Sequence, residues 1–254
     1  MALSERSETK GTGSKSEQAY SWIRSRISSH AFGPGFRLVL GTIADELGMS
    51  VVPVREAIRQ LAGKYSLSLD MRDLDAHVNL FAPDIQVGRK GTGRAALKAW
   101  VDETLREQFT GTSHHVGQHI IEFIDPDHAV GVVYSKNEHE TGPEWVIMQM
   151  LYWDDYERID GQWYFRRRLP CYWYASDLNK PPIGTQKMRW PGREPYAGTF
   201  HDLFPSWTEF WASRPDKEQL PQVATAAPLE HFLATLRRGA GAPRPCRGPG
   251  RAGP

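Results

Sequence analysis

Side chains suited to acid–base chemistry lie in the middle of this 254-residue chain. Tyr65 and Asp70 are five residues apart in a stretch with helical periodicity, and Asp73 follows them. The neighbouring residues His114 and His115 open a strand-like segment. A carboxylate beside a histidine orients the imidazole ring and supports its charged form, so a His–Asp pair makes a general base. These residue types favour proton abstraction by a mechanism that needs no cofactor.

Asp154 and Arg167 are further candidates, and they lie on two neighbouring predicted strands. Arg167 could stabilise an enolate or a leaving group through its positive charge. It belongs to a run of three arginines at 166–168, and because a strand alternates faces, at least one of the three is expected on the solvated surface. A second interpretation stays open, in which Asp73 caps the next helix and the other groups only make a pocket polar.

Five histidines stand close together in the sequence without the spacing of a metal site: His114, His115, His119, His128 and His139. On a regular strand His115 and His119 would share a side, but no third ligand follows at a suitable position. The segment "GTGRAAL" (91–97) lacks the Lys-Ser/Thr pair of a phosphate-binding loop. We therefore expect neither a metal ion nor another cofactor.

The first quarter of the chain predicts three helices joined by tight turns. Helical spacing covers residues 18–30, the segment "FGPGFRL" then makes a Pro-Gly turn, and a short helix follows at 41–48. Ser50 is a good N-cap for the third helix, and Pro53 suits its first turn. This arrangement is typical of a helix-turn-helix unit.

The pattern changes after Tyr65. Helical spacing continues to Phe81 and returns over 91–109, with a short strand expected at 85–88. Four segments then alternate polar and apolar residues and are rich in aromatic residues, which predicts strands at 114–125, 128–141, 144–160 and 161–174. Helices followed by an antiparallel meander indicate an α+β domain with a curved sheet packed on helices. The aromatic residues are expected mainly in its core, with a few lining a pocket for a flat hydrophobic or aromatic ligand.

The composition is that of a soluble globular protein. Net charge is +1, so no overall basic field points to nucleic acid, and DNA contact would need a local patch. Two cysteines, Cys171 and Cys246, are too few for a disulfide framework and fit a reducing cytoplasm. No apolar run is long enough to cross a membrane, and the polar N-terminus is not a secretory signal. We therefore expect a cytoplasmic protein without membrane contact.

The stretch "FGPGFRLVLGTIADELGMSVVPVREAIRQL" (32–61) resembles the GntR family of bacterial transcription regulators. The most specific part is "PVREAIRQL". The resemblance implies a winged helix-turn-helix whose third helix enters the major groove of DNA. Ser50 and Val52 would then lie near phosphate and base edges, and Arg55 would face the DNA. The segment "AGKYSLSLD", which follows this helix, does not have the pattern of a wing hairpin.

A second resemblance begins where the first ends. The segments "YSLSLDMRDLDAHVNLFAPD" (65–84), "GRAALKAW" (93–100), "SHHVGQHIIEF" (113–123) and "YWDDYERIDGQWYFRRR" (152–168) are similar to the SnoaL-like family of the nuclear-transport-factor-two-like superfamily. This implies a cone-shaped α+β barrel with a strongly bent antiparallel sheet and one deep pocket. Tyr65 and Asp70 would point into the pocket, and the family histidine corresponds to His114. Members include dehydratases, isomerases, cyclases and binding modules without activity.

The two resemblances share the segment "EAIRQLAG", which predicts one helix from about residue 51 to 71 that serves both domains. Its weak point is Gly63, since glycine costs about 1 kcal/mol in a helix interior. The domains are then expected as a lead-in (1–17), a helix-turn-helix unit (18–63), a SnoaL-like cone with an extension (64–213), and a helix with a Gly/Pro/Arg-rich tail (214–254).

Two functions fit this organisation. One is a transcription regulator that acts as a homodimer and binds double-stranded DNA and a small hydrophobic or aromatic ligand. The other is a cofactor-independent lyase or isomerase of dehydratase or cyclase type, acting on a hydrophobic cyclic substrate. The intact "PVREAIRQL" favours the regulator. The missing wing, the near-neutral charge and the complete cone favour the enzyme or a binding module.

Overall fold

The computed structural model describes residues 26, 52–212 and 232–243. The chain divides into two compact units, 1–55 and 56–254. The helices expected at 18–30 and 41–48 and the N-cap Ser50 lie outside the described residues. The elements below belong to the second unit, together with the helix that leads into it.

The helix α3 (Val52–Asp70) is continuous through Gly63, as the two overlapping resemblances predict. It ends at Asp70 because Arg72 adopts a left-handed backbone conformation with a φ of 60°. Asp73 then caps the short helix α4 (Leu74–Val78), and its Oδ1 accepts a hydrogen bond of 3.0 Å from the amide of Ala76. The helical periodicity between 65 and 81 is therefore divided between two helices.

The helix α5 (Arg94–Gln108) begins after Gly93, which has a φ of 92°. The short strand expected at 85–88 is absent from the described residues, which have only one isolated bridge there, between Gln86 and Thr92. The reason is that the backbone of this segment bonds within its own tight loop, with the amide of Val87 donating to the carbonyl of Gly91. No partner is left to extend the bridge into a ladder.

Four antiparallel strands form a meander in the order β1-β2-β3-β4. They are β1 (Gly111–Phe123), β2 (His128–Thr141), β3 (Glu144–Ile159) and β4 (Gln162–Asp177). The β3–β4 hairpin turns through Asp160 and Gly161, which both have positive φ, as a type I′ turn requires. The predicted α+β class with a meander of four strands is confirmed.

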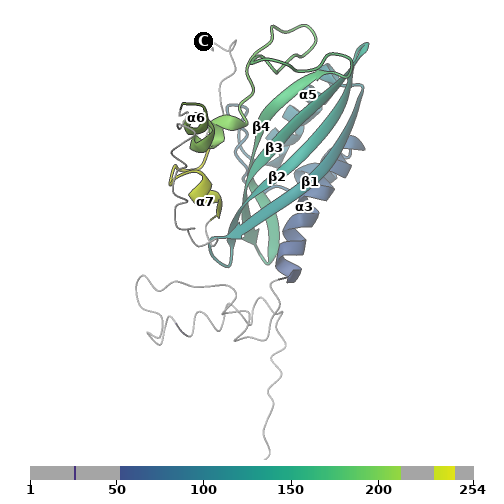
Figure 1. Ribbon diagram of the computed structural model, residues 1–254. Coiled ribbons are helices and arrows are strands. Elements are labelled where there is room, and N and C mark those ends of the chain that lie inside the picture. Colours follow the sequence, from purple (N-terminus) through teal and green to yellow (C-terminus); the bar gives the residue numbers. More distant parts are fainter. Residues whose placement is uncertain (1–25, 27–51, 213–231, 244–254) are drawn as a thin grey trace, which may run out of the picture. The chain divides into compact units, whose positions relative to one another are not determined.

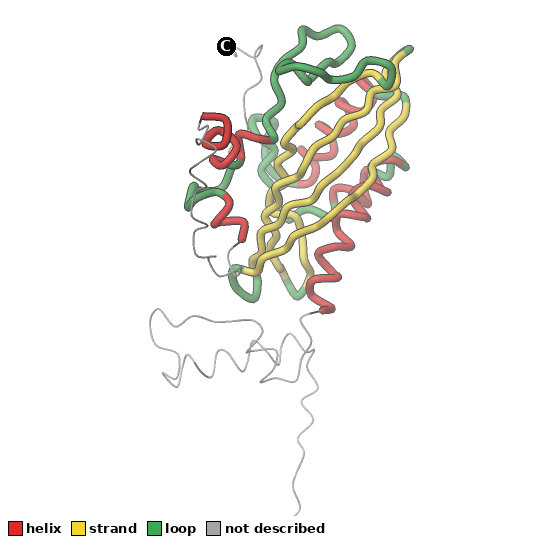
Figure 2. The backbone as a smooth tube through the Cα atoms, viewed as in Figure 1, coloured by secondary structure: helices red, strands yellow, loops and turns green. Residues whose placement is uncertain are grey.

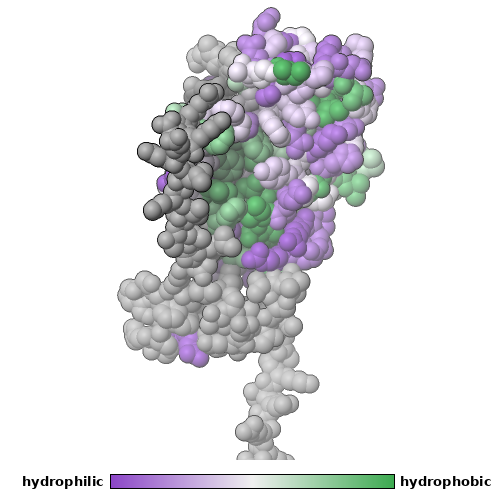
Figure 3. All heavy atoms as spheres, viewed as in Figure 1, coloured by the Kyte–Doolittle hydropathy of each residue, from purple (hydrophilic) through white to green (hydrophobic). Residues whose placement is uncertain are grey.

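Helices cover both faces of the sheet (Figures 1 and 2). On the inner face, α3 packs on a cluster of buried residues: Ala62, Val133, Val146, Met148, Met150, Tyr152, Ala175 and Met188. On the outer face lie the 3₁₀-helix η1 (His201–Leu203), α6 (Pro205–Ala212) and α7 (Phe232–Leu236). The outer cluster consists of Val132, Leu151, Trp153, Leu169, Cys171, Phe200, Leu203 and Leu233. Figure 3 shows hydrophobic residues gathered on this outer side, beside the C-terminal segments.

Three bulges shift the alternation of the sheet, one in β1 and two in β4, where Trp173 is the extra residue of the second. In β1, Val116 pairs with Ser135 but His119 pairs with Val133, so β1 contains one extra residue. In β4, Phe165 pairs with Tyr156 but Arg167 pairs with Asp155, so one residue is again extra. A bulge of this kind moves every residue beyond it to the opposite face. The strand residues that face inward therefore differ from those that strict alternation predicts.

Two glycines provide a test of the helix and the sheet. A Cβ at Gly63 would meet no atom within 4 Å, whereas a Cβ at Gly131 would lie 2.9 Å from both the Ile120 carbonyl oxygen and a ring carbon of Tyr156. We expect Gly63→Ala to raise the free energy of unfolding by about 0.5–1 kcal/mol. The matched change Gly131→Ala should lower it by about 1–3 kcal/mol. Urea unfolding measures both; a loss of stability in Gly63→Ala would contradict the continuous helix.

Candidate functional site

Asp70 and His114 are directly paired on the inner face of the sheet. Oδ1 of Asp70 lies 2.6 Å from Nδ1 of His114, and its Oδ2 accepts the backbone amide of His114 at 2.8 Å. The hydroxyl of Thr112 donates to Oδ1 at 2.8 Å. Arg72 in turn donates to the Thr112 hydroxyl at 2.7 Å. The last residue of α3 is thus bonded to β1 at three points.

These contacts define the tautomer of His114. An ionised carboxylate only accepts hydrogen bonds, so in the neutral ring of His114 Nδ1 carries the proton and Nε2 has the lone pair. Among the described residues, Nε2 has no hydrogen-bond partner. Burial would raise the pKa of Asp70, but the hydrogen bonds from the side chain and the backbone of His114 outweigh it and lower that pKa. The carboxylate is therefore charged at neutral pH, as a partner of a general base must be.

Tyr65 lies beside this pair. Its ring centroid is 6.3 Å from that of His114, and its hydroxyl is hydrogen-bonded to that of Tyr152. Burial raises the pKa of Tyr65 above its ordinary value, although the charge of Arg168 opposes the rise. Tyr65 is therefore a neutral phenol at neutral pH.

Asp154 and Arg168 form a buried ion pair on the same face. Nε and Nη2 of Arg168 each donate to Asp154 at 3.0 Å, and the Asp154 side chain is fully buried. The guanidinium carbon lies 3.9–4.4 Å from the ring centroids of three aromatic residues: Tyr65, Tyr152 and Phe165. Nη1 of Arg168 is buried and has no partner among the described residues. A buried donor without an acceptor is costly, so this atom is suited to bind a ligand oxygen.

Arg167 lies on the other face of the sheet from this ion pair. Its guanidinium contacts Asp155 at 3.4 Å and the backbone carbonyl of Pro243. The bulge at Arg166 turns Arg168 inward in the place where regular alternation would put Arg167. The run of three arginines indicated a charged group here, but the sequence could not identify which arginine faces inward.

His119 shares the inner face with His114, because the bulge in β1 intervenes, while His115 is exposed on the other side. Nε2 of His119 lies 2.9 Å from the hydroxyl of Tyr156, which donates to Asp154 at 2.8 Å. The expectation that His115 and His119 share a side is thus wrong. The chain from His119 through Tyr156 holds Asp154 in place beneath Arg168.

His139 is a further residue of this site, which the sequence analysis considered only as a possible metal ligand. Its ring lies 5.8 Å from that of His114, and its Nδ1 is buried without a partner among the described residues. Burial, followed by the charge of His114, lowers its pKa to about 4. At neutral pH His139 therefore presents an uncharged ring next to the pair formed by Asp70 and His114.

The residues expected to contact DNA lie at the start of α3. Ser50 lies outside the described residues, and Val52 is the first residue of the helix. Arg55 follows on α3 and is exposed. The structure therefore places Arg55 on the same helix as Tyr65 and Asp70.

The described part of the chain has neither a membrane-spanning helix nor a cluster of metal ligands. None of its helices is long and apolar enough to cross a membrane. Within it, no group of three or more His, Cys, Asp or Glu side chains could hold a metal ion.

The site thus combines a His–Asp pair with a buried arginine on a curved sheet closed by helices, an arrangement of the small-molecule-binding α+β class. Family comparisons agree with this. The SnoaL-like domain model matches residues 50–169, and the model of bacterial regulatory proteins of the gntR family matches residues 15–69. The chain thus has a segment matched by the gntR family model followed by a SnoaL-like domain, and residues 50–69 belong to both matches. It matches no curated protein.

Several solved structures are similar to part of the chain. A candidate scytalone dehydratase from Novosphingobium aromaticivorans is 27% identical over 56% of this chain and 96% of its own, with a TM-score of 0.45. Hexachlorocyclohexane dehydrochlorinase LinA-type3 from Novosphingobium barchaimii is 20% identical over 51% and 93%, with a TM-score of 0.47. The Kfla4162 protein from Kribbella flavida is 17% identical over 50% and 95%, with a TM-score of 0.44.

The buried histidines generate a pH prediction. Burial lowers the pKa of His77, His119 and His139 to about 4, from 6.5. The unfolded chain therefore binds protons between pH 6.5 and 4 that the folded chain does not, so stability is full above pH 6.5 and falls towards pH 4. Each such histidine contributes up to about 1.4 kcal/mol per pH unit.

Urea unfolding between pH 7 and 4.5 measures this slope. The variant His139→Phe removes one of the three groups and should reduce the slope by about a third. Stability that does not change over this range would contradict the burial of these rings in the neutral form.

Proposed function

We propose that this protein is a ligand-responsive transcription regulator. In this proposal the helix-turn-helix unit (18–63) binds double-stranded DNA, and the cone (64–213) binds a small hydrophobic or aromatic molecule. The observation that carries it is the overlap of the two domain matches on α3. Residues 50–69 belong to both, and Val52–Asp70 is one helix.

The shared helix supplies a route from ligand to DNA. Arg55 and Tyr65 stand on the same helix, and Tyr65 packs against the inner cluster of the sheet. A ligand that binds one position of Tyr65 better than another shifts the equilibrium by that difference in affinity. Since no loop separates Tyr65 from Arg55, a tilt of α3 is passed to the DNA-facing end.

We further propose that the protein acts as a homodimer in the cytoplasm. Helix-turn-helix dimers read two half-sites about one helical turn apart, and a single unit without a wing makes few phosphate contacts. A dimer doubles those contacts, which supports specific binding at physiological salt.

Substitution of Arg55 tests the regulator. Duplexes selected from a random pool at low salt should bind the wild type, and Arg55→Ala should weaken that binding by about 1–3 kcal/mol if the contact is to a base. The matched control is Arg89→Ala, which removes an exposed cation from the loop before α5. Fluorescence anisotropy measures both variants. Equal affinity of Arg55→Ala and Arg89→Ala, or no selected duplex, would argue against a regulator.

A second candidate function is a cofactor-independent lyase acting on a hydrophobic cyclic substrate. The specific observation that favours it is the unpartnered Nε2 of His114, whose other nitrogen is bonded to Asp70 at 2.6 Å. In the proposed reaction Nε2 takes a proton from the carbon next to a carbonyl. The electron pair of that C–H bond forms a C=C bond as the bond to a leaving hydroxyl breaks. The imidazolium returns its proton to the hydroxyl, which leaves as water.

Each of the other inner side chains has a role in this proposal. The charged carboxylate of Asp70 stabilises the imidazolium. Nη1 of Arg168 donates to the carbonyl oxygen, on which negative charge develops. Asp154 positions that guanidinium, and the ring of Tyr65 lies near both the guanidinium and His114. Arg168 thus has the charge-stabilising role that the sequence analysis assigned to Arg167.

Turnover of hydrophobic cyclic hydroxyketones tests this candidate. We expect His114→Ala and Asp70→Asn to lower kcat by about 100-fold or more while ligand binding is retained. Asp73→Asn is a matched control, because it makes the same carboxylate-to-amide change on a residue that only caps α4. If both site variants behave like Asp73→Asn, the cone is a binding or sensing domain and the regulator proposal stands alone.

A further inference from the structure

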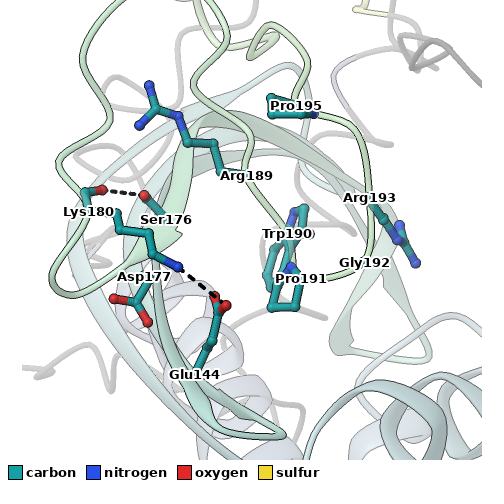
Figure 4. Close-up of a pocket in the computed structure, with 10 residues that line it drawn as sticks. All are labelled: Glu144, Ser176, Asp177, Lys180, Arg189, Trp190, Pro191, Gly192, Arg193 and Pro195. Carbon is teal, nitrogen blue, oxygen red and sulfur yellow. Dashed lines mark hydrogen bonds and ion pairs between the residues drawn. The ribbon is translucent and has the colours of Figure 1, made fainter.

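A cavity of about 260 Å³ lies where β3 begins and β4 ends (Figure 4). Glu144, Ser176 and Asp177 line it from the strands, and Lys180 lines it from the turn that follows β4. The rest of its wall comes from the segment between Arg189 and Pro195, including Trp190 and Pro191. None of the site residues described above takes part in this wall.

The segment carrying Trp190 is a short hairpin. The backbones of Met188 and Tyr196 exchange hydrogen bonds of 2.9 and 3.1 Å, and Met188 is fully buried. Between them, the amide of Arg193 donates to the carbonyl of Trp190, and Gly192 has a φ of 70°. Pro-Gly in the centre of such a turn is typical of type II and fixes the residue before it. The position of Trp190 is therefore set by the backbone.

The indole ring of Trp190 also contacts aromatic residues in the interior of the domain. Its ring centroid lies 5.6 Å from that of His139 and 5.9 Å from that of Phe109. His139 in turn lies 5.8 Å from His114. The indole thus lies between the cavity and the interior region that contains His114. The side chain of His114 is only 5% exposed.

Two charged groups at the cavity, Lys180 and Arg189, are already engaged. Lys180 pairs with Glu144 at 3.4 Å, and the guanidinium of Arg189 donates to three backbone carbonyls. In Figure 4 the side chain of Arg193 extends away from Lys180, on the far side of Trp190. An anionic group bound at Lys180 or Arg189 would have to break one of these pairings, whereas a flat uncharged ring could pack on Trp190 and Pro191 without loss.

We propose that this cavity is the outer ligand site of the cone, that it accepts an uncharged aromatic ring stacked on Trp190, and that Trp190 controls access from it to His114. The inference rests on the proposed ligand-binding function of the cone and specifies the class of its ligand and the route of access. Trp190 acts on the interior through His139, so it is a gating and specificity residue.

Chemical labelling of histidine tests the gate. Diethyl pyrocarbonate acylates unprotonated imidazole nitrogens, and mass spectrometry reports the rate at His114 relative to the half-exposed His128. We expect Trp190→Ala to raise this relative rate about tenfold, because it removes the wall, and Trp190→Phe to leave it within about twofold. Trp207→Ala, which removes an exposed indole from α6, is the control. An unchanged rate in a Trp190→Ala protein that unfolds at the wild-type temperature would overturn the gate.

Two fluorescent probes with the same rings test the ligand class. N-phenyl-1-naphthylamine is uncharged, and 8-anilinonaphthalene-1-sulfonate adds one negative charge. We expect the uncharged probe to bind more tightly, and its Kd to rise about tenfold in Trp190→Ala but not in Trp190→Phe. Tighter binding of the sulfonate, or a Kd that Trp190→Ala does not change, would overturn the assignment. Neither measurement involves DNA or turnover, so each can fail while the proposed function stands, and the reverse also holds.

Discussion

The carboxylate of Asp70 joins the end of α3 to the first strand of the sheet. It accepts hydrogen bonds from Thr112 and from both the ring and the backbone of His114. Charge-assisted hydrogen bonds are about twice as strong as neutral ones, so one side chain fixes the helix against β1 and the ring of His114 at once. The direction in which Nε2 of His114 points depends on this contact.

The interior of the cone is polar for a protein core. A buried ion pair stabilises a fold little unless its remaining groups are bonded, because the loss of solvation offsets the attraction of the charges. Asp154 meets that condition through Arg168 and Tyr156, whereas Nη1 of Arg168 and Nδ1 of His139 do not. An apolar core of the same volume would be at least as stable. The presence of these unpaired buried groups is therefore better explained by ligand binding than by a contribution to stability.

The helix α3 lies in the overlap of the two family matches, residues 50–69, and runs without a break from Val52 to Asp70. In α3, Gly63 is exposed and its position has room for a side chain, so nothing in the packing requires glycine there. The helix is continuous because residues on both sides of Gly63, such as Ile58 and Leu69, are buried against the cone. Tertiary packing therefore outweighs the low helix propensity of glycine.

The sequence by itself determined the local features of this protein. Periodicity and turn residues are properties of short segments, so the helix from 52 to 70, the four strands and the cap at Asp73 could all be predicted. So could the approach of His114 to Asp70, through the resemblance to a family with that pair. Only the tertiary structure decided which arginine faces inward and which histidines share a face, because a bulge depends on pairing with the neighbouring strand. It also decided the role of Trp190, since the packing of an irregular loop follows from long-range contacts that have no period in the sequence.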